Sequence, residues 1–410
     1  MANHPPHVRV SPLPRLTRQV AQSVLRPRMW PSPLCPDTTQ LYFRGSNAIW
    51  HAVKALKLEP GSGVLFPAYH CGIELDVLLA AGLTVTFYGV GRELKINVRA
   101  LAAQLRPGTW AVYVIHYFGI PQDLTDLAEF CHEHRLALIE DCAMALYSRR
   151  GERPTGSDGD VAIFSMWKTV AMPFGGALVV NNPNLEVPKS VMPPSRYEVL
   201  RVSKQLLEME FKGSRLFEGV RRWCVEPFAK VVRGVSAVTS ADTWRKQALW
   251  VPLFAPQQRD WGITRLSRHL FLTADQEQIR TARRDNYQAL LNVVRDCASC
   301  VPLCGDLPDG ACPLYFPVIV SNAVTFRAFL LSKGVEAFRF WRELHPSFPR
   351  DEFPDETYLR AHVVALPVHQ HLSESGRLRI CEALESWDRS GQVGEPQQAL
   401  SEPATQYVEG

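Results

Sequence analysis

Between residues 40 and 182, apolar runs of strand length alternate with segments whose apolar positions recur at helical spacing. Residues 110–116 (WAVYVIH) form a continuous apolar run, as expected of a strand buried on both faces. We also expect a helix that is capped by Asp123. The remaining segments of this region are predicted as helices at 48–58 and 73–81 and as strands at 64–67, 84–88, 136–139, 161–164 and 177–180. Such an alternation predicts βαβ units and a mostly parallel sheet.

The pattern changes in the second half of the chain. Residues 196–235 are helical and basic, and a further helical segment follows at 266–294. The last part predicts an α+β arrangement, with strands at 314–320 and 364–367 and helices at 323–334 and 374–387. The resulting division is a basic, Pro-rich N-terminal extension (1–39), a large domain (40–262) with a basic helical segment (196–260), a small C-terminal domain (263–390) and a loose tail (391–410).

Composition and charge exclude several classes of protein. The 410 residues are 46% hydrophobic and 21% charged, which excludes a disordered or fibrous chain. The net charge of +4 gives no reason to expect a nucleic-acid partner. No apolar run reaches the roughly 18 residues of a membrane-spanning helix, and the N-terminus lacks the apolar core of a secretory signal. We therefore expect a cytoplasmic protein with a large core.

Cysteines and N-terminal arginines leave two alternatives to weigh. Four of the ten cysteines cluster at Cys297, Cys300, Cys304 and Cys312 and could hold zinc or an iron–sulfur cluster. Their spacing is not that of paired CxxC motifs, so free thiols without a metal are the favoured interpretation. The Arg-rich leader could be a transit peptide or a membrane-surface arm, but an extension partly ordered against the body is favoured.

Three polar segments carry the candidate chemistry. Lys168 lies just past a predicted buried strand, at the sheet edge where ligands bind in open α/β sheets, and is a candidate Schiff-base residue. Asp141 directly follows another such strand, where a carboxylate could keep a pyridine nitrogen protonated. Gly45, Ser46 and Asn47 open a predicted helix whose free N–H groups could hold a phosphate. Each segment alone has a structural explanation. Together, and in this order, the three segments would supply partners for a phosphate, a pyridine nitrogen and an aldehyde.

Over roughly residues 40–388 the chain resembles the pyridoxal-phosphate-dependent sugar aminotransferases of the DegT/DnrJ/EryC1/StrS family. The resemblance runs through GSNAIWHAVKAL, PGSGVLFPAYH, VYVIHYFGIPQDL, LALIEDCAMAL, GSDGDVAIFSMWKTVAMPFGG and VALPVHQHLS. It implies an α/β, aspartate-aminotransferase-like fold (fold type I), with a large domain built on a mostly parallel sheet and a small α+β C-terminal domain.

The resemblance also implies roles for individual residues. Lys168 corresponds to the lysine that binds the cofactor aldehyde and moves protons, and Asp141 to the partner of the pyridine nitrogen. The residues matched to the cofactor phosphate are Gly45, Ser46, Asn47 and Ser165. The residues matched to positions near the substrate are His116, Tyr69 and Met144. No metal site is implied.

Three departures from the family pattern concern the site. Met144 stands where the family often has a Gln near the cofactor's phenolic oxygen, and a thioether cannot donate a hydrogen bond. The aromatic residue that usually stacks on the ring falls on Cys71, so His70 is our favoured substitute, with Tyr69 as an alternative. The Gly-x-Asn-x-Arg signature, through which a second subunit reaches the phosphate, is absent before Leu266, and Arg265 or Arg268 could replace it.

The function implied is a ping-pong transamination in polysaccharide or secondary-metabolite biosynthesis, in a homodimer. Glutamate is the expected amino donor, and a keto sugar, usually linked to a nucleotide, the expected acceptor. Two alternatives stay open: a pyridoxal-phosphate enzyme with a non-sugar acceptor or a different reaction, and a catalytically silent scaffold on the same fold.

Overall fold

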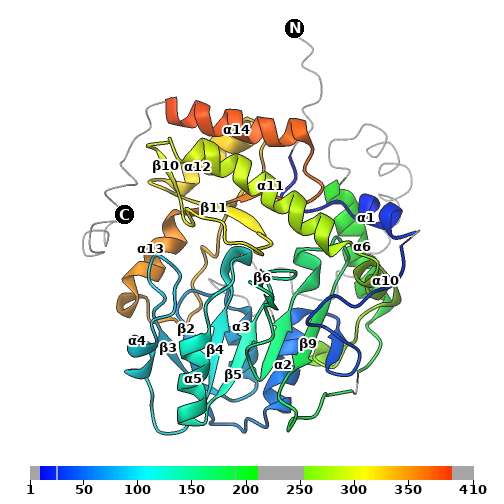
Figure 1. Ribbon diagram of the computed structural model, residues 1–410, viewed down its shortest axis with the longest axis vertical. Coiled ribbons are helices and arrows are strands. Elements are labelled where there is room, and N and C mark those ends of the chain that lie inside the picture. Colours follow the sequence, from blue (N-terminus) through cyan, green and yellow to red (C-terminus); the bar gives the residue numbers. More distant parts are fainter. Residues whose placement is uncertain (1–9, 25, 190, 211–253, 390–410) are drawn as a thin grey trace, which may run out of the picture.

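The computed structural model describes residues 10–24, 26–189, 191–210 and 254–389. Figure 1 shows these residues arranged around two sheets, the larger in the lower half of the view and the smaller above it. The strands of the larger sheet all precede residue 262 and those of the smaller sheet all follow it.

The larger sheet has seven strands in the order β1-β9-β8-β5-β4-β2-β3. Five neighbouring strands, from β3 to β8, run parallel, and β9 is antiparallel to both of its neighbours. The strands are β1 (Thr39–Tyr42), β2 (Gly63–Pro67), β3 (Thr84–Tyr88), β4 (Thr109–Ile115), β5 (Ala137–Asp141), β8 (Val161–Phe164) and β9 (Gly176–Val180). Every residue of β8 and β9 is buried, so both faces of the sheet are covered there.

Helices α2 (Gly45–Ala55), α3 (Ile73–Ala80), α4 (Val98–Ala102) and α5 (Thr125–His134) connect these strands. Helix α2 packs on β8 and β9, and α5 packs on β5 (Figure 1). The loop after β5 carries a small hairpin, β6 (Arg149–Arg150) and β7 (Arg153–Pro154). Short 3₁₀ turns lie at η1 (Tyr117–Gly119), η2 (Met166–Lys168), η4 (Pro256–Gln258) and η5 (Arg350–Glu352).

The smaller sheet is antiparallel, with the order β10-β11-β13-β12. Its strands are β10 (Cys300–Pro302), β11 (Tyr315–Val320), β12 (Phe338–Arg339) and β13 (Val363–Pro367). The helices of this half are α10 (Arg265–Leu272), α11 (Gln276–Val294), α12 (Ala323–Ser332), α13 (Pro354–His362) and α14 (Glu374–Arg389). Leu290, Phe326 and Trp387 from α11, α12 and α14 form a separate core against β11 and β13.

Most predicted elements are present with shifts of a few residues at their ends. The strands at 84–88 and 161–164 coincide with β3 and β8. The predicted helix 266–294 is in fact two helices, because the side chain of Asp275 caps α11 by accepting a hydrogen bond from the Gln278 N–H (3.0 Å). Asp123 accepts from the Thr125 N–H (3.1 Å) but lies one residue before the N-cap of α5.

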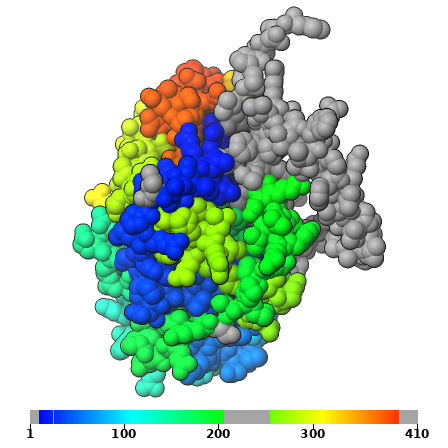
Figure 2. Space-filling view, turned by 90° about the vertical axis from the view of Figure 1, so that its right-hand side faces the viewer, coloured from blue at the N-terminus to red at the C-terminus, as the bar shows by residue number. Residues whose placement is uncertain are grey.

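The N-terminal extension is ordered over its described part. Helix α1 (Leu16–Ser23) contacts α6 (Arg196–Glu210) and α10, and Val10 pairs with Val335. Figure 2 shows the segment in dark blue, between the orange α14 and the yellow-green region of α10. Only α6 and residues 254–260 of the predicted basic segment are described, and 211–253 and the tail 391–410 lie outside the described residues.

The cysteine cluster is distributed over different parts of the core. Cys297 and Cys300 interact with each other in the core of the smaller sheet, whereas Cys312 packs in a different core cluster. Among the described residues, no helix combines the length and apolar character that crossing a membrane requires.

Candidate active site

A cavity of about 330 Å³ lies at the carboxyl ends of β5 and β8, the edge at which open α/β sheets bind ligands. Its walls come from the start of α2, the turn before α3, the end of β5 and the segment after β8. Five of the predicted site residues line it: Gly45, Ser46, Asp141, Ser165 and Lys168. The fold therefore brings together side chains that are more than 120 positions apart in the sequence.

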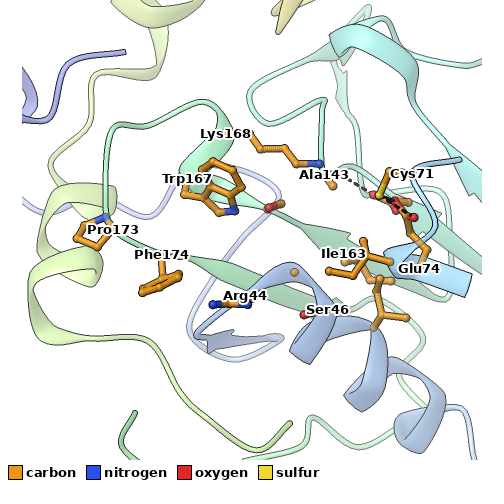
Figure 3. Close-up of a pocket in the computed structure, with 15 residues that line it drawn as sticks. Arg44, Ser46, Cys71, Glu74, Ala143, Ile163, Trp167, Lys168, Pro173 and Phe174 are labelled. Atoms are coloured by element: carbon orange, nitrogen blue, oxygen red, sulfur yellow. Dashed lines mark hydrogen bonds between the residues drawn. The ribbon is translucent and has the colours of Figure 1, made fainter. Parts of the chain in front are cut away.

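One end of the cavity is formed by the N-terminus of α2. Gly45 and Ser46 open this helix, and Ser165, which carries a hydroxyl group, lies against Gly45; Figure 3 labels Ser46 at this end. A Cβ atom on Gly45 would stand 3.2 Å from the Cβ of Ser165, and one on Gly176 would stand 2.2 Å from the carbonyl of Arg44. The backbone of this end is therefore packed as closely as glycine allows, and the N-terminus of a helix, which favours anions, lies there.

Arg44 adds a cation to this end of the cavity and was not predicted. Its guanidinium lies 5.0 Å from the ring centre of Phe174 and 5.5 Å from that of Phe43. Burial lowers the pKa of Arg44, although the carboxylate of Glu198 opposes the shift, and the group stays charged at neutral pH. Within the described residues, no carboxylate lies within ion-pair distance of this guanidinium.

At the other end, Asp141 is held by two strong hydrogen bonds. The Tyr113 hydroxyl donates to its Oδ2 at 2.6 Å, and the Ala143 N–H donates to its Oδ1 at 2.7 Å. Burial raises the pKa of Asp141, and the two hydrogen bonds together with the charge of Lys168 offset part of this rise. A carboxylate fixed in such a place can accept a hydrogen bond from a protonated ring nitrogen.

Lys168 ends the 3₁₀ turn η2, which follows β8. Figure 3 shows its side chain extending along the cavity, with the amino nitrogen toward Ala143 and Cys71. Arg44 and Ser46 lie at the far end in this view, and the charge of Lys168 acts on Asp141.

Cys71 and Glu74 complete the wall on that side. The Cys71 thiol donates to Oε1 and Oε2 of Glu74, each at 3.0 Å. Glu74 belongs to the first turn of α3 and is 4% exposed. Cys71 was noted in the sequence only as a departure, and Glu74 was missed.

His70 and Tyr69, the suggested substitutes for the stacking residue, do not line the cavity. The His70 ring packs among Phe66, Phe87 and Phe348, and burial lowers its pKa well below the ordinary value. Tyr69 is fully buried. The structure thus turns both side chains into the core and Cys71 alone of the three toward the cavity.

Asn47, His116 and Met144 also lie outside the lining residues. Asn47 serves the backbone, because its side chain accepts from the Arg44 N–H (3.0 Å) and donates to the Arg259 carbonyl (2.9 Å). Met144 is 2% exposed and packs in the main core. Arg265 and Arg268 lie on α10 and do not line the cavity of their own chain, and their expected role at the phosphate of a second subunit stays a prediction.

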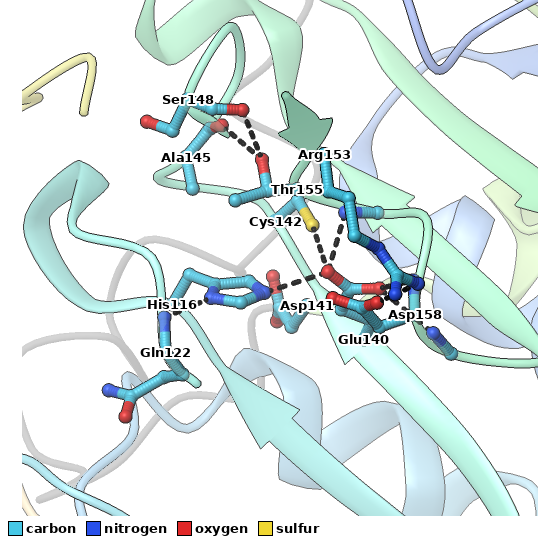
Figure 4. A network of polar contacts seen from close by, with 12 residues as sticks. His116, Gln122, Glu140, Asp141, Cys142, Ala145, Ser148, Arg153, Thr155 and Asp158 are labelled. Carbon is cyan, nitrogen blue, oxygen red and sulfur yellow. Dashed lines mark hydrogen bonds and ion pairs between the residues drawn. The ribbon is translucent and has the colours of Figure 1, made fainter. Parts of the chain in front are cut away.

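His116 belongs to a buried network behind Asp141 (Figure 4). Its Nδ1 accepts from the Gln122 N–H (2.9 Å), so its Nε2 carries the hydrogen that is donated to Glu140 (2.9 Å). Glu140 also accepts from the N–H groups of Asp158 and Gly159, both at 3.0 Å. Burial raises the pKa of Glu140, but these hydrogen bonds outweigh it and the net shift is downward. The network ties the loop 142–160 to β5 and holds Asp141 in register.

Comparisons with known proteins agree with this architecture. Residues 43–194 match the model of the DegT/DnrJ/EryC1/StrS aminotransferase family, so the resemblance seen in the sequence is confirmed over this segment. A UDP-N-acetyl-3-dehydro-alpha-D-glucosamine 3-aminotransferase from Acidithiobacillus ferrooxidans is 30% identical over 146 residues, 35% of this chain and 40% of that protein. The matches thus span about 40% of the length of the curated relatives.

Solved structures extend the likeness of fold to nearly the whole chain. The aminotransferase TlmJ from Streptoalloteichus hindustanus has a TM-score of 0.61 at 18% identity, covering 90% of this chain and 95% of that one. Spr1654 from Streptococcus pneumoniae, in its PLP form, has a TM-score of 0.63 at 14% identity, covering 93% and 99%. The predicted aspartate-aminotransferase-like fold, fold type I, is confirmed.

Proposed function

We propose that the protein is a pyridoxal-phosphate-dependent aminotransferase that transfers an amino group from glutamate to a keto sugar carried on a nucleotide. The observation that supports this most is the placement of Lys168 and Asp141 in one cavity with an anion-binding end opposite them. The family match, and the glucosamine 3-aminotransferase among the relatives, support the same activity and substrate class.

The residues present fit pyridoxal phosphate. Its phosphate would be held by the N–H groups of Gly45 and Ser46, the hydroxyl of Ser165 and the guanidinium of Arg44. Its ring nitrogen would be held by Asp141, which the Tyr113 hydroxyl and the Ala143 N–H keep oriented. A cavity of about 330 Å³ at the sheet edge is within the usual range for a cofactor or small-molecule site.

When bound, pyridoxal phosphate supplies an electron sink for the carbon that exchanges its amino group. Lys168 provides the amine that links the cofactor to the chain, and it then holds or returns a proton at its Nζ. Asp141 keeps the proton on the ring nitrogen, since two strong hydrogen bonds fix its carboxylate in a buried place. The family resemblance further supports a cytoplasmic homodimer.

The test is the absorption spectrum of the purified protein, recorded with pyridoxal phosphate before and after addition of glutamate. We expect a visible band that is absent from Lys168→Ala and is lost when glutamate is added. A band that glutamate leaves unchanged would favour a different pyridoxal-phosphate reaction or donor. Absence of any band would contradict the proposal and favour a silent scaffold.

A further inference from the structure

Glu74 is a second buried carboxyl group in the cavity, and the activity proposed above assigns it no role. It lines the same wall as Asp141 and Lys168, and it is 4% exposed. A buried carboxyl group without a cationic or strong hydrogen-bonding partner is costly. The position of Glu74 therefore needs an explanation.

The two carboxyl groups differ in how they are held. Each oxygen of Asp141 accepts a short hydrogen bond from an O–H or N–H group. Glu74 accepts from the Cys71 thiol, which is a weak donor. Burial, followed by the charge of Glu74, raises the pKa of that thiol well above its ordinary value, so Cys71 keeps its hydrogen.

Charged and titratable groups surround Glu74 on several elements. Asp141 on β5 and Tyr113 on β4 interact with it electrostatically, and burial, followed by the charges of these acids, raises the pKa of Tyr113 so that its hydroxyl stays neutral. Arg360 on α13 interacts with it from a distance, but its guanidinium is bound to the carbonyls of Ala68 and His70. Burial, then the charge of Asp141, raises the pKa of Glu74, and the Cys71 thiol and Lys168 act against this rise.

Among the described residues that line the cavity, the cations are Arg44 and Lys168, and Arg44 lies at the end away from Cys71 and Glu74 (Figure 3). The amino group of Lys168 interacts electrostatically with Cys71, Glu74 and Asp141. Figure 3 shows its nitrogen directed to the side where the Cys71–Glu74 pair lies. The charge of Asp141 is already stabilised by two donors, so that of Glu74 is the less compensated of the two.

We propose that Glu74, held by Cys71, is a positioning residue that acts through Lys168, with its carboxylate stabilising positive charge on the Lys168 Nζ. The inference rests on the proposed function only in that Lys168 is the reactive amine. In this arrangement Asp141 serves the ring nitrogen and Glu74 serves the lysine nitrogen, so that two carboxylates in one cavity have separate tasks.

The test measures the pH at which the Lys168 amine becomes reactive in the full-length protein without cofactor. Pulses of acetic anhydride at graded pH, followed by peptide mass spectrometry, give a labelling midpoint for Lys168, with the exposed lysines as internal references. Two unit charges within about 10 Å of each other, at an effective dielectric constant near 20, interact by at least about 1.4 kcal/mol, which shifts such a midpoint by about one unit. We therefore expect Glu74→Gln to lower the midpoint by at least about one unit.

Matched variants separate this effect from a structural one. Glu356 is equally buried and accepts from the Val90 and Gly91 N–H groups away from the cavity, so Glu356→Gln leaves the midpoint unchanged. Glu74→Asp keeps the negative charge, so its labelling midpoint should lie close to that of the wild-type protein. Cys71→Ala removes the thiol donor and lowers the midpoint by a smaller amount, which provides a second reading if Glu74→Gln folds poorly.

A Glu74→Gln midpoint equal to that of the wild-type protein would overturn the proposal, as would an equal shift in Glu356→Gln. The labelling needs no cofactor, so its outcome is distinct from that of the proposed function. Where cofactor does bind, the pH midpoint of the visible band should fall in Glu74→Gln in the same direction.

Discussion

Replacing Arg44 tests how the site binds the phosphate of the cofactor, independently of how it binds the ring. The Arg44 guanidinium lies at the end of the cavity formed by Gly45, Ser46 and Ser165, positioned by the rings of Phe43 and Phe174. A hydrogen bond to a charged group contributes about 1.5–3 kcal/mol. Its loss in Arg44→Gln should therefore weaken the binding of pyridoxal phosphate by about 10- to 150-fold.

The assay compares pyridoxal phosphate with pyridoxal, which has the same ring and no phosphate. We expect Arg44→Gln to raise the Kd for pyridoxal phosphate and to leave that for pyridoxal unchanged, both measured by absorbance titration. Arg259→Gln is the control, because its guanidinium lies 5.1 Å from the Trp50 ring but outside the cavity lining. Equal weakening of both ligands, or no effect on either, would refute the role of Arg44 as the phosphate cation.

Two further substitutions test the supports of Asp141. Tyr113→Phe removes the 2.6 Å hydrogen bond to Asp141, which raises the pKa of that carboxyl group further. Binding of the cofactor should therefore weaken about 10-fold, and by more at pH 6 than at pH 8. An equal loss of affinity at both pH values would contradict this role of Tyr113. His116→Ala removes a buried donor to Glu140 and should lower the free energy of unfolding by about 3 kcal/mol in urea titrations. Because the pKa of Glu140 is lowered in the fold, the carboxylate stabilises the folded protein above the ordinary glutamate pKa, and this contribution is lost as pH falls through the lowered value. His116→Ala should move this loss of stability to higher pH. An unchanged acid unfolding transition would argue against the network.

The predictable part of the fold is the part decided by burial. Strands such as β8 are apolar along their whole length because both faces are covered, and this pattern is visible in the sequence. Strand β1 was missed because Thr39–Tyr42 is short and mixes polar and apolar residues, and its pairing with β9 is a tertiary contact. The break between α10 and α11 was missed because the helical periodicity continues across it.

The residues of the site likewise divide into those that the sequence pattern could place and those that only the structure could place. Lys168 and Asp141 could be placed at the cavity because Asp141 ends a buried strand and Lys168 follows another, and strand ends meet at one sheet edge. His70 could not be excluded, since in the turn after β2 no periodicity decides which of three consecutive side chains faces the cavity. An acidic residue in the first turn of a helix, as Glu74 is, is ordinarily explained by the helix dipole, so its place in the cavity emerged only from the structure.

The central claim is that Lys168 is the residue to which pyridoxal phosphate becomes attached. The most direct measurement is reduction of the cofactor-loaded protein with borohydride, followed by proteolysis and mass spectrometry of every lysine-containing peptide. The account predicts a pyridoxyl-phosphate group on the peptide that contains Lys168 and its absence from the other lysines. A label on a different lysine, or no covalent label in a protein that binds the cofactor, would contradict it.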